Sequence, residues 1–259
     1  MKAKTLFAAT LLVAGAAFAD STTVETEYVL GVLPVSATGI YTKQVVVSIP
    51  WVDEGTGGNI GITNLIKTAG LPADVQLHWY NADTGKFQHW EVSGNQWVPV
   101  KSVTDASVSE DASDVKQLER GGAVLLTTAT DTLPSSIYVV GQVGTSASVT
   151  TTIAANTTTL VAPPQVSTTN FDLNDITWEW ANVDAGDVIT VGYAAAGFPI
   201  AYTNGLGGAE STTKWYPAYK SSSGATTIKA GKGFWYKHVG SSAMTITWSA
   251  PYVPDAPAE

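Results

Sequence analysis

The feature that most constrains this chain is an internal repeat, in which five short segments recur in the same order about a hundred residues later. In residues 229–236 two glycines flank one lysine and three aromatics follow, and residues 120–126 are a plainer version. The five pairs are 46–50 with 159–164 (offset 113), 74–80 with 187–193 (113), 97–100 with 215–218 (118), Gly121 with Gly231 (110), and 137–141 with 244–248 (107). Loop insertions produce small drifts of this kind, so the pattern predicts a tandem duplication.

Each repeat has short runs of β-branched and aromatic residues, separated by turn residues. One helix is predicted, over residues 65–69, because Asn64 is placed to cap it and Gly70 to end it in the left-handed region. The predicted fold class is all-β, with two tandem sandwich-like or barrel-like repeats of about 100 residues and at most one or two short helices. A single larger sheet system built from both repeats is the alternative.

The N-terminus has the pattern of a secretory signal, with Lys2 and Lys4, an apolar run, and small residues before Asp20. The apolar run is too short for a comfortable membrane span, which argues against the rival interpretation as a retained anchor. The pattern predicts a secreted protein in the extracellular space, at the cell surface or in the periplasm. The predicted division of the chain is a signal peptide (1–19), an N-terminal strand segment (20–41), β repeat 1 (42–148), β repeat 2 (149–250) and a Pro-rich tail (251–259).

Charge and cysteine content exclude several classes of function. Removing the signal leaves 11 basic and 22 acidic residues, a net charge of −11, with no basic stripe, so no nucleic-acid partner is expected. No second apolar stretch is long enough for a membrane span. The chain has no cysteine, which rules out disulfides, thiol nucleophiles and thiolate metal sites.

A β-hairpin is predicted around residues 81–86, where Asp83 and Gly85 lie between two alternating segments. A four-residue turn with Gly85 in the left-handed region sets His78 opposite His89 on one face of the sheet. Neutral imidazoles in that arrangement are weak candidates for a shared metal, with Glu91 on the same face. No third ligand besides Glu91 is evident, so a histidine pair without metal is the expected outcome, and no cofactor is predicted.

No catalytic residue is predicted. Asp83–Thr84–Gly85 matches the aspartic-protease triplet, but that chemistry needs two carboxylates sharing a proton, and no second Asp-Thr/Ser-Gly occurs. No Gly-x-Ser-x-Gly elbow or phosphate-binding loop occurs either. Four acidic residues cluster in the second repeat without the alternating spacing of a calcium loop, and turn or capping roles are expected for them: Asp172, Asp175, Asp184 and Asp187.

The nine tryptophans are the remaining signal. Sugar rings stack on flat aromatic faces, so four tryptophans in or near predicted strands are candidate ligand-binding residues: Trp79, Trp90, Trp97 and Trp215. The competing interpretation is that tryptophans fill the core of small β domains that lack disulfides. Alternation along residues 234–236 sends Trp235 to the face opposite its neighbours, and apolar residues 124–126 in the first repeat indicate that both faces there are covered.

Nearly the whole chain resembles a group of exported, functionally uncharacterised β-rich repeat proteins of planctomycete–verrucomicrobial bacteria. The matching residues are 28–31, 45–51 and the Gly-x-Gly-Phe-Trp element at 231–235; the glycine-tyrosine pair usual in the first of these is missing. The resemblance implies export and a β architecture, and it transfers no catalytic residue.

These observations predict an exported, non-enzymatic β protein that serves as a structural component of the cell surface, extracellular matrix or an appendage. Open sheet edges favour self-association, with residues 23–33 as a candidate donated strand. The first alternative is a polysaccharide-binding module that uses exposed tryptophans. The second is a glycan-active enzyme whose carboxylates the sequence does not identify.

Overall fold

The computed structural model describes residues 28–34, 44–49, 60–112, 117–129, 133–134, 136–142, 148–164, 171–174, 178–193, 199–204, 214–218, 226–228 and 231–249. The predicted signal peptide, Trp51, Asp175 and the Pro-rich tail lie outside these residues. Within them the chain forms nineteen strands and one four-residue helix, so the all-β prediction is confirmed. None of the described residues belongs to a helix with the length and hydropathy needed to cross a membrane.

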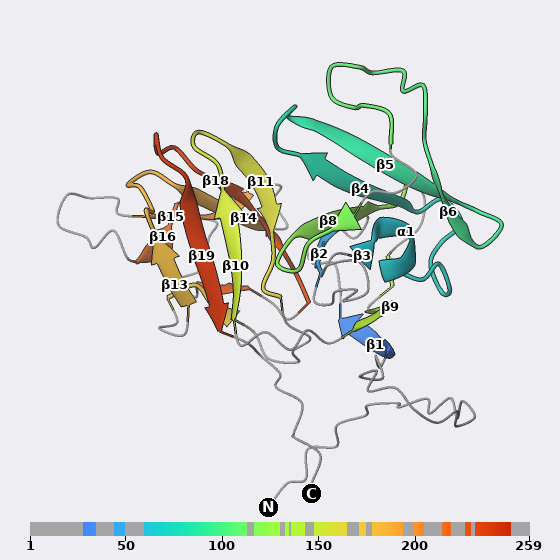
Figure 1. Cartoon of the computed structure of the whole chain (residues 1–259), viewed down its shortest axis with the longest axis horizontal. Coiled ribbons are helices and arrows are strands. Elements are labelled where there is room, and N and C mark those ends of the chain that lie inside the picture. Colours follow the sequence, from blue (N-terminus) through green and yellow to red (C-terminus); the bar gives the residue numbers. More distant parts are fainter. Residues whose placement is uncertain are drawn as a thin grey trace, which may run out of the picture.

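A five-stranded antiparallel sheet organises the first half of the chain (Figure 1). Its strands, in spatial order, are β2 (Gln44–Ser48), β8 (Ala123–Thr127), β4 (Gln76–Asn81), β5 (Lys86–Ser93) and β6 (Gln96–Pro99). Successive residues of a strand point to opposite faces, so Val124 and Leu126 enter the first core whereas Leu125 packs on the other face. β9 (Ser136–Gln142), β7 (Gln117–Leu118) and α1 (Ile62–Leu65) add further residues to the first core. β1 (Tyr28–Pro34) pairs with β9, and β3 (Ile60–Gly61) pairs with β7.

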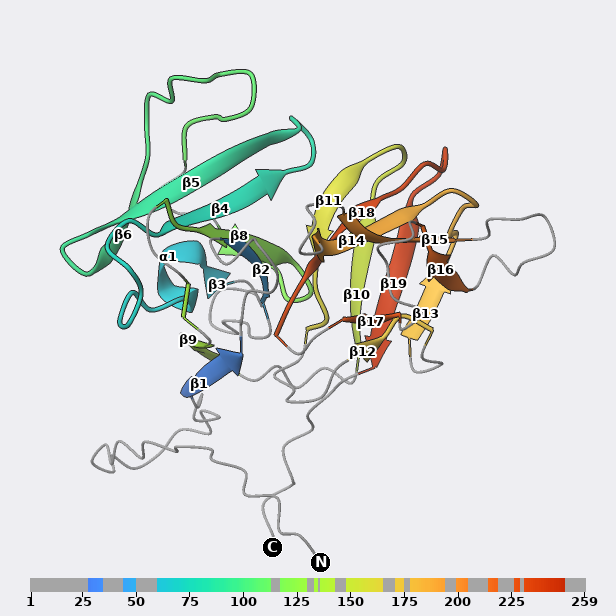
Figure 2. The ribbon, with the colours of Figure 1, turned by 180° about the vertical axis from the view of Figure 1, so that it is seen from behind.

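A second five-stranded antiparallel sheet lies beside the first, as Figures 1 and 2 both show. Its strands, in spatial order, are β11 (Thr158–Val161), β18 (Phe234–Lys237), β14 (Val188–Tyr193), β15 (Pro199–Asn204) and β16 (Trp215–Pro217). The second core lies between this sheet and two smaller sheets. One is formed by β10 (Ser148–Ile153), β19 (Met244–Ser249) and β13 (Trp178–Ala181), the other by β12 (Phe171–Asp172) and β17 (Thr227–Ile228).

The two five-stranded sheets have the same strand order. If the five strands of each sheet are numbered along the chain, their spatial order is 1-5-2-3-4 in both sheets. The edge pairings also match: Trp97 lies opposite Val92 in the first sheet, and Trp215 opposite Asn204 in the second.

The two sheets meet through reciprocal main-chain contacts. Ser48 N–H donates to the carbonyl of Gly231 and Ala162 N–H to that of Gly121, both at 3.1 Å. Single β-bridges join Val47 to Lys232 and Gly122 to Val161. A small apolar cluster fills the space between the sheets, made by Ala123, Leu160 and Ala162 with Val46, Tyr80, Leu125 and Trp235.

Gly233 lies where this contact is tightest. A Cβ atom there would come within 2.7 Å of the Val161 carbonyl oxygen and the Val46 Cγ1, and within 2.9 Å of the Ala123 Cβ. Glycine is therefore required by the close approach of the two sheets, which explains the second glycine of the 231–235 element. Trp235 packs against Leu160 and Tyr80 and is not free on the surface, so the expected covering of both faces of β18 is confirmed.

The helix prediction is wrong in its boundaries. α1 spans Ile62–Leu65 with Gly61 at its N-cap, so Asn64 lies inside the helix and caps nothing. Ile66 ends the helix in an extended conformation and forms a β-bridge with Val139. Tertiary pairing with β9 thus overrides the local signal, and Gly70 takes its left-handed φ of 79° in a later turn.

Candidate functional site

The predicted hairpin and its histidine pair are confirmed. Asn81 pairs with Lys86, which leaves a four-residue turn, and Gly85 has a φ of 68°. The Asn81 carbonyl accepts from Gly85 N–H at 2.8 Å, and the side chain of Asn81 accepts from Asp83 N–H at 3.1 Å. Asp83 is thus a turn residue, as expected.

The turn sets the register that brings His78 directly opposite His89. The ring centroids are 5.5 Å apart and the planes are inclined by 33°. His78 Nε2 lies 2.9 Å from Thr127 Oγ1 on the neighbouring strand β8, and the ring meets Phe87 edge-on at 6.1 Å. Burial and the neighbouring His89 lower the pKa of His78 to about 4, so its imidazole is neutral at neutral pH.

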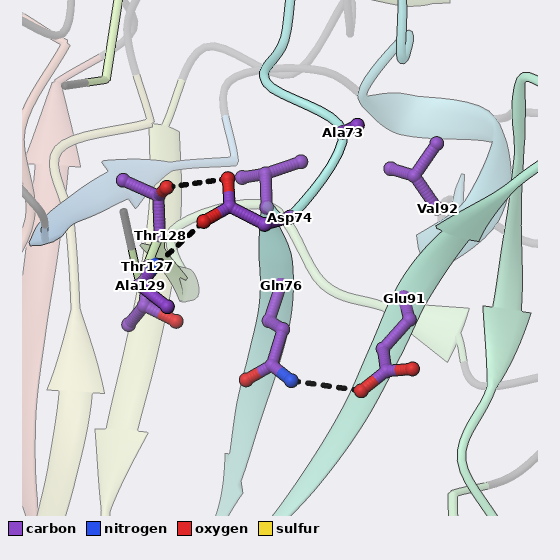
Figure 3. A pocket seen from close by; sticks show the side chains of 9 residues that line it. Ala73, Asp74, Gln76, Glu91, Val92, Thr127, Thr128 and Ala129 are labelled. Carbon is purple, nitrogen blue, oxygen red and sulfur yellow. Dashed lines mark hydrogen bonds between the residues drawn. The ribbon is translucent and has the colours of Figure 1, made fainter. Parts of the chain in front are cut away.

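A polar pocket of about 370 Å³ opens beside this pair, where β4 begins and β5 and β8 end (Figure 3). Asp74 accepts from Thr128 Oγ1 at 2.7 Å and from Ala129 N–H at 3.0 Å. On the other side, the Gln76 amide donates to Glu91 Oε1 at 2.8 Å. Both carboxylates are therefore partly engaged, and no described group of three or more His, Cys, Asp or Glu side chains is placed to hold a metal ion.

Aromatic rings continue the same face beyond the histidines. Tyr80 lies against Phe87 with centroids 5.1 Å apart, and Trp235 of the second sheet meets them at 5.0 and 5.9 Å. All three contacts are edge-to-face, a geometry of aromatic packing rather than of an open stacking platform. The end of the face farthest from the pocket is thus part of the contact between the sheets.

Three of the four tryptophans predicted as candidate ligand-binding residues lie buried in a core. The exposed fractions of Trp90, Trp97 and Trp215 are 0%, 6% and 2%. Trp97 also donates its indole N–H to the Ile66 carbonyl at 2.7 Å. Rings buried in a core present no face to a sugar, so the carbohydrate-binding alternative loses three of the four residues on which it depended. Trp79 is half-buried and packs against the first core.

A buried ionic cluster in the second half was not predicted. Asp187, which precedes β14, is fully buried and accepts from Tyr236 Oη, Val239 N–H and His238 Nδ1, at 2.8, 2.8 and 2.9 Å. Asp184 N–H donates a fourth hydrogen bond to Asp187, at 3.1 Å. Asp187 therefore has the expected turn role and in addition binds Tyr236, His238 and Val239. The His238 side chain, 51 residues away along the chain, is 1% exposed.

The partners of His238 define its protonation. Nδ1 faces the Asp187 carboxylate and Nε2 lies 2.7 Å from the Ser242 carbonyl oxygen, and both of these groups accept hydrogen bonds only. Burial opposes the charged ring, but these two hydrogen bonds and the charge of Asp187 outweigh it and raise the pKa of His238. Burial and Asp187 likewise raise the pKa of Tyr236. Asp187 and His238 thus form a closed ion pair that stabilises the fold and has no solvent-facing nucleophile.

Position and pairing explain why sequence reasoning missed this cluster. Asp187 stands just before a predicted strand and His238 just after an aromatic one, and their proximity follows from β14 and β18 pairing. The repeat match between residues 74–80 and 187–193 could have indicated the role of Asp187. Asp74 accepts a hydrogen bond from the main chain just after β8, as Asp187 does just after β18.

Family models, curated proteins and solved structures were compared with this chain, and none matches it. The resemblance to exported repeat proteins of planctomycete–verrucomicrobial bacteria therefore stays a prediction.

Proposed function

We propose that this chain is an exported, non-enzymatic structural protein of the cell surface, extracellular matrix or an appendage, and that copies of it associate through open sheet edges. The observation that carries the proposal is the pair of uncharged edge strands β1 and β10. The Asp187–His238 pair supports it too, because its hydrogen-bonding groups are used within the fold.

The proposal includes a tandem duplication, with repeats over residues 42–148 and 149–250. The shared strand order of the two five-stranded sheets supports it. So do equivalent aspartate contacts, in which Asp74 accepts from Ala129 N–H at 3.0 Å and Asp187 from Val239 N–H at 2.8 Å. Val47 pairs with Val124 in the first sheet, and Val161 pairs with Phe234 in the second. If Val124 is taken as equivalent to Phe234, then Val47 is equivalent to Val161. This differs by one residue from the sequence alignment that sets Pro163 against Pro50.

β1 and β10 occupy equivalent places in this scheme. β1 pairs with β9 and β10 pairs with β19, and in the described part of the chain no strand pairs with the outer edge of either. Neither Tyr28–Pro34 nor Ser148–Ile153 contains a charged residue. An open edge without charge is a template for pairing with another chain.

The outer edges of the large sheets are built differently. β6 and β16 each carry a proline, Pro99 and Pro217, which has no N–H to donate to an added strand. β1 also ends in a proline, Pro34, so the contrast holds for residues 28–33 of β1 and for the whole of β10, which has no proline. It favours association at these two edges, and the proposed partner is a second copy of this chain, joined by β-strand addition.

The proposal is tested by sedimentation of residues 20–259 over a wide concentration range. We expect mass to rise with concentration, and Thr152→Lys on exposed β10 to shift the midpoint of association at least tenfold, because a charge on an edge strand opposes added pairing. Thr245→Lys is the matched control, since Thr245 lies directly opposite Thr152 on β19, a strand paired on both sides.

A chain that stays monomeric at every concentration would overturn the proposal. Equal effects of the two lysine substitutions would place the association on a face of the sheet and not on its edge.

A further inference from the structure

Four polar side chains gather on one face of the first sheet, where β8, β4 and β5 lie side by side. Gln76 on β4 lies directly between Thr127 on β8 and Glu91 on β5, because it pairs with both. His78 follows Gln76 by two positions on β4, so its side chain leaves the same face. We propose that Thr127 and Gln76 become joined by an ester bond, which forms within the folded chain with His78 as the base and releases ammonia.

Thr127 has the surroundings of an activated nucleophile. A hydroxyl group is a weak nucleophile at neutral pH and is activated by a base within hydrogen-bond reach. His78 Nε2 lies 2.9 Å from Thr127 Oγ1. Burial and the neighbouring His89 lower the pKa of His78, so the ring is neutral at neutral pH. In the tautomer that carries its hydrogen on Nδ1, the ring accepts the hydroxyl hydrogen of Thr127 at Nε2.

Gln76 provides the carbonyl carbon that such a nucleophile attacks. Residues directly opposite each other in an antiparallel pair have Cβ atoms about 4.5–5.5 Å apart, so the Thr127 hydroxyl can reach the Gln76 carboxamide. On the other side, Gln76 Nε2 donates to Glu91 Oε1 at 2.8 Å, as Figure 3 shows. Because this bond turns the amide nitrogen towards β5, the carbonyl group is left on the side of β8, where Thr127 lies.

The reaction needs no cofactor and no oxidant. Thr127 Oγ1 bonds to Gln76 Cδ while His78 Nε2 takes the hydroxyl proton. When the tetrahedral intermediate collapses, the bond between Cδ and Nε2 of Gln76 breaks, and His78 returns the proton to the departing nitrogen, which leaves as ammonia. The chain thus loses one nitrogen and three hydrogens. The polar pocket of about 370 Å³, which both Gln76 and Thr127 line, gives the ammonia a way out.

The ester joins two central strands of the first sheet in a chain that has no cysteine and therefore no disulfide. The second sheet provides an internal comparison. With Val124 equivalent to Phe234, the positions of Thr127 and Gln76 correspond to Lys237 and Val188, which pair with each other but offer neither a hydroxyl nor a carboxamide. One ester per chain is therefore expected.

The test is the mass of residues 20–259 after the folded protein has stood at neutral pH and has then been denatured. We expect a mass about 17 Da below that of the sequence, the loss of one ammonia. Trypsin places Gln76 and Thr127 in separate peptides, 68–86 and 121–214, and these should be recovered as one joined species. Brief treatment with alkali should separate them, because esters hydrolyse in base far faster than amides.

Variants distinguish the ester from other losses of ammonia, such as succinimide formation at an asparagine. Thr127→Val and Gln76→Met should abolish the joined peptides, whereas Thr127→Ser should keep them. His78→Gln should lower the joined fraction at least tenfold, because the base is lost. Gln88→Met is the matched control, since Gln88 lies opposite Trp79 and faces no hydroxyl there, and it should leave the joined fraction unchanged.

The wild-type mass needs no substitution, so it decides the question even where a variant fails to fold. Wild-type protein that keeps the full mass of its sequence, or joined peptides that persist in Thr127→Val, would overturn the proposal.

Discussion

His238 and Asp187 form a buried ion pair, with Nδ1 and Oδ2 2.9 Å apart and both side chains fully shielded from solvent. The pair joins the start of β14 to the end of β18, and the Ser242 carbonyl holds the far side of the ring. The pair is a polar contact beside the apolar and aromatic side chains of the second core.

Removing the negative partner leaves a buried cation without its counter-charge. We expect Asp187→Asn to lower the free energy of unfolding by about 3 kcal/mol, because breaking one side of a buried pair exposes the desolvation cost of the other. Urea unfolding at pH 6 measures this. Glu179→Gln, an exposed substitution in the same half, should change the value by less than about 0.5 kcal/mol.

The same pair makes stability depend on pH. The pKa of His238 is raised in the folded chain, so its contribution is complete below the unfolded pKa of about 6.5 and is lost as pH rises through the folded value. The difference in unfolding free energy between the wild type and His238→Gln should be largest near pH 5.5 and shrink towards pH 9. A difference that grows with pH would show that the folded ring is neutral.

His78 has the opposite dependence. Its pKa falls to about 4 in the folded chain, so the folded state disfavours its protonation, and stability is lost as pH falls from 6.5 towards 4. The wild type should lose at most about 3 kcal/mol relative to His78→Gln over this interval. Parallel urea titrations of the two proteins, in chelator to remove metal, measure the difference; parallel curves would contradict the shift.

Gly233 tests the contact between the sheets. Adding a methyl group at a position 2.7 Å from a carbonyl oxygen forces the sheets apart, so Gly233→Ala should cost about 1–3 kcal/mol. Gly94 has a φ of 57° and no atom within 4 Å of its Cβ position, so Gly94→Asn serves as a tolerated control. Thermal unfolding compares the two, and equal melting temperatures would mean that the contact relaxes freely.

The elements predicted best from the sequence are those defined by local chemistry. The hairpin followed from Asp83 and Gly85 between alternating segments, and its four-residue turn fixed the His78–His89 register. Alternation along residues 234–236 likewise placed Trp235 opposite Phe234 and Tyr236. In each case side-chain period and turn type determine the geometry without help from distant parts of the chain.

The features that failed depend on partners far away in the sequence. Ile66 was predicted to be helical but forms a β-bridge with Val139, and the sequence around Ile66 does not indicate this pairing. Tryptophans suit both a sugar-binding face and a core, and only the packing of each large sheet against smaller sheets showed that Trp90 and Trp215 are buried. The Asp187–His238 pair likewise exists because two strands about fifty residues apart lie side by side.

Hydrogen exchange at low and high protein concentration is the most direct test of association of copies through the open edges of β1 and β10. We expect the outward-facing amides of Ser148–Ile153 and Tyr28–Pro34 to gain protection as concentration rises, while the amides of β6 at Gln96–Pro99 do not change. A mass that rises with concentration while neither β1 nor β10 gains protection would rule out association through these edges.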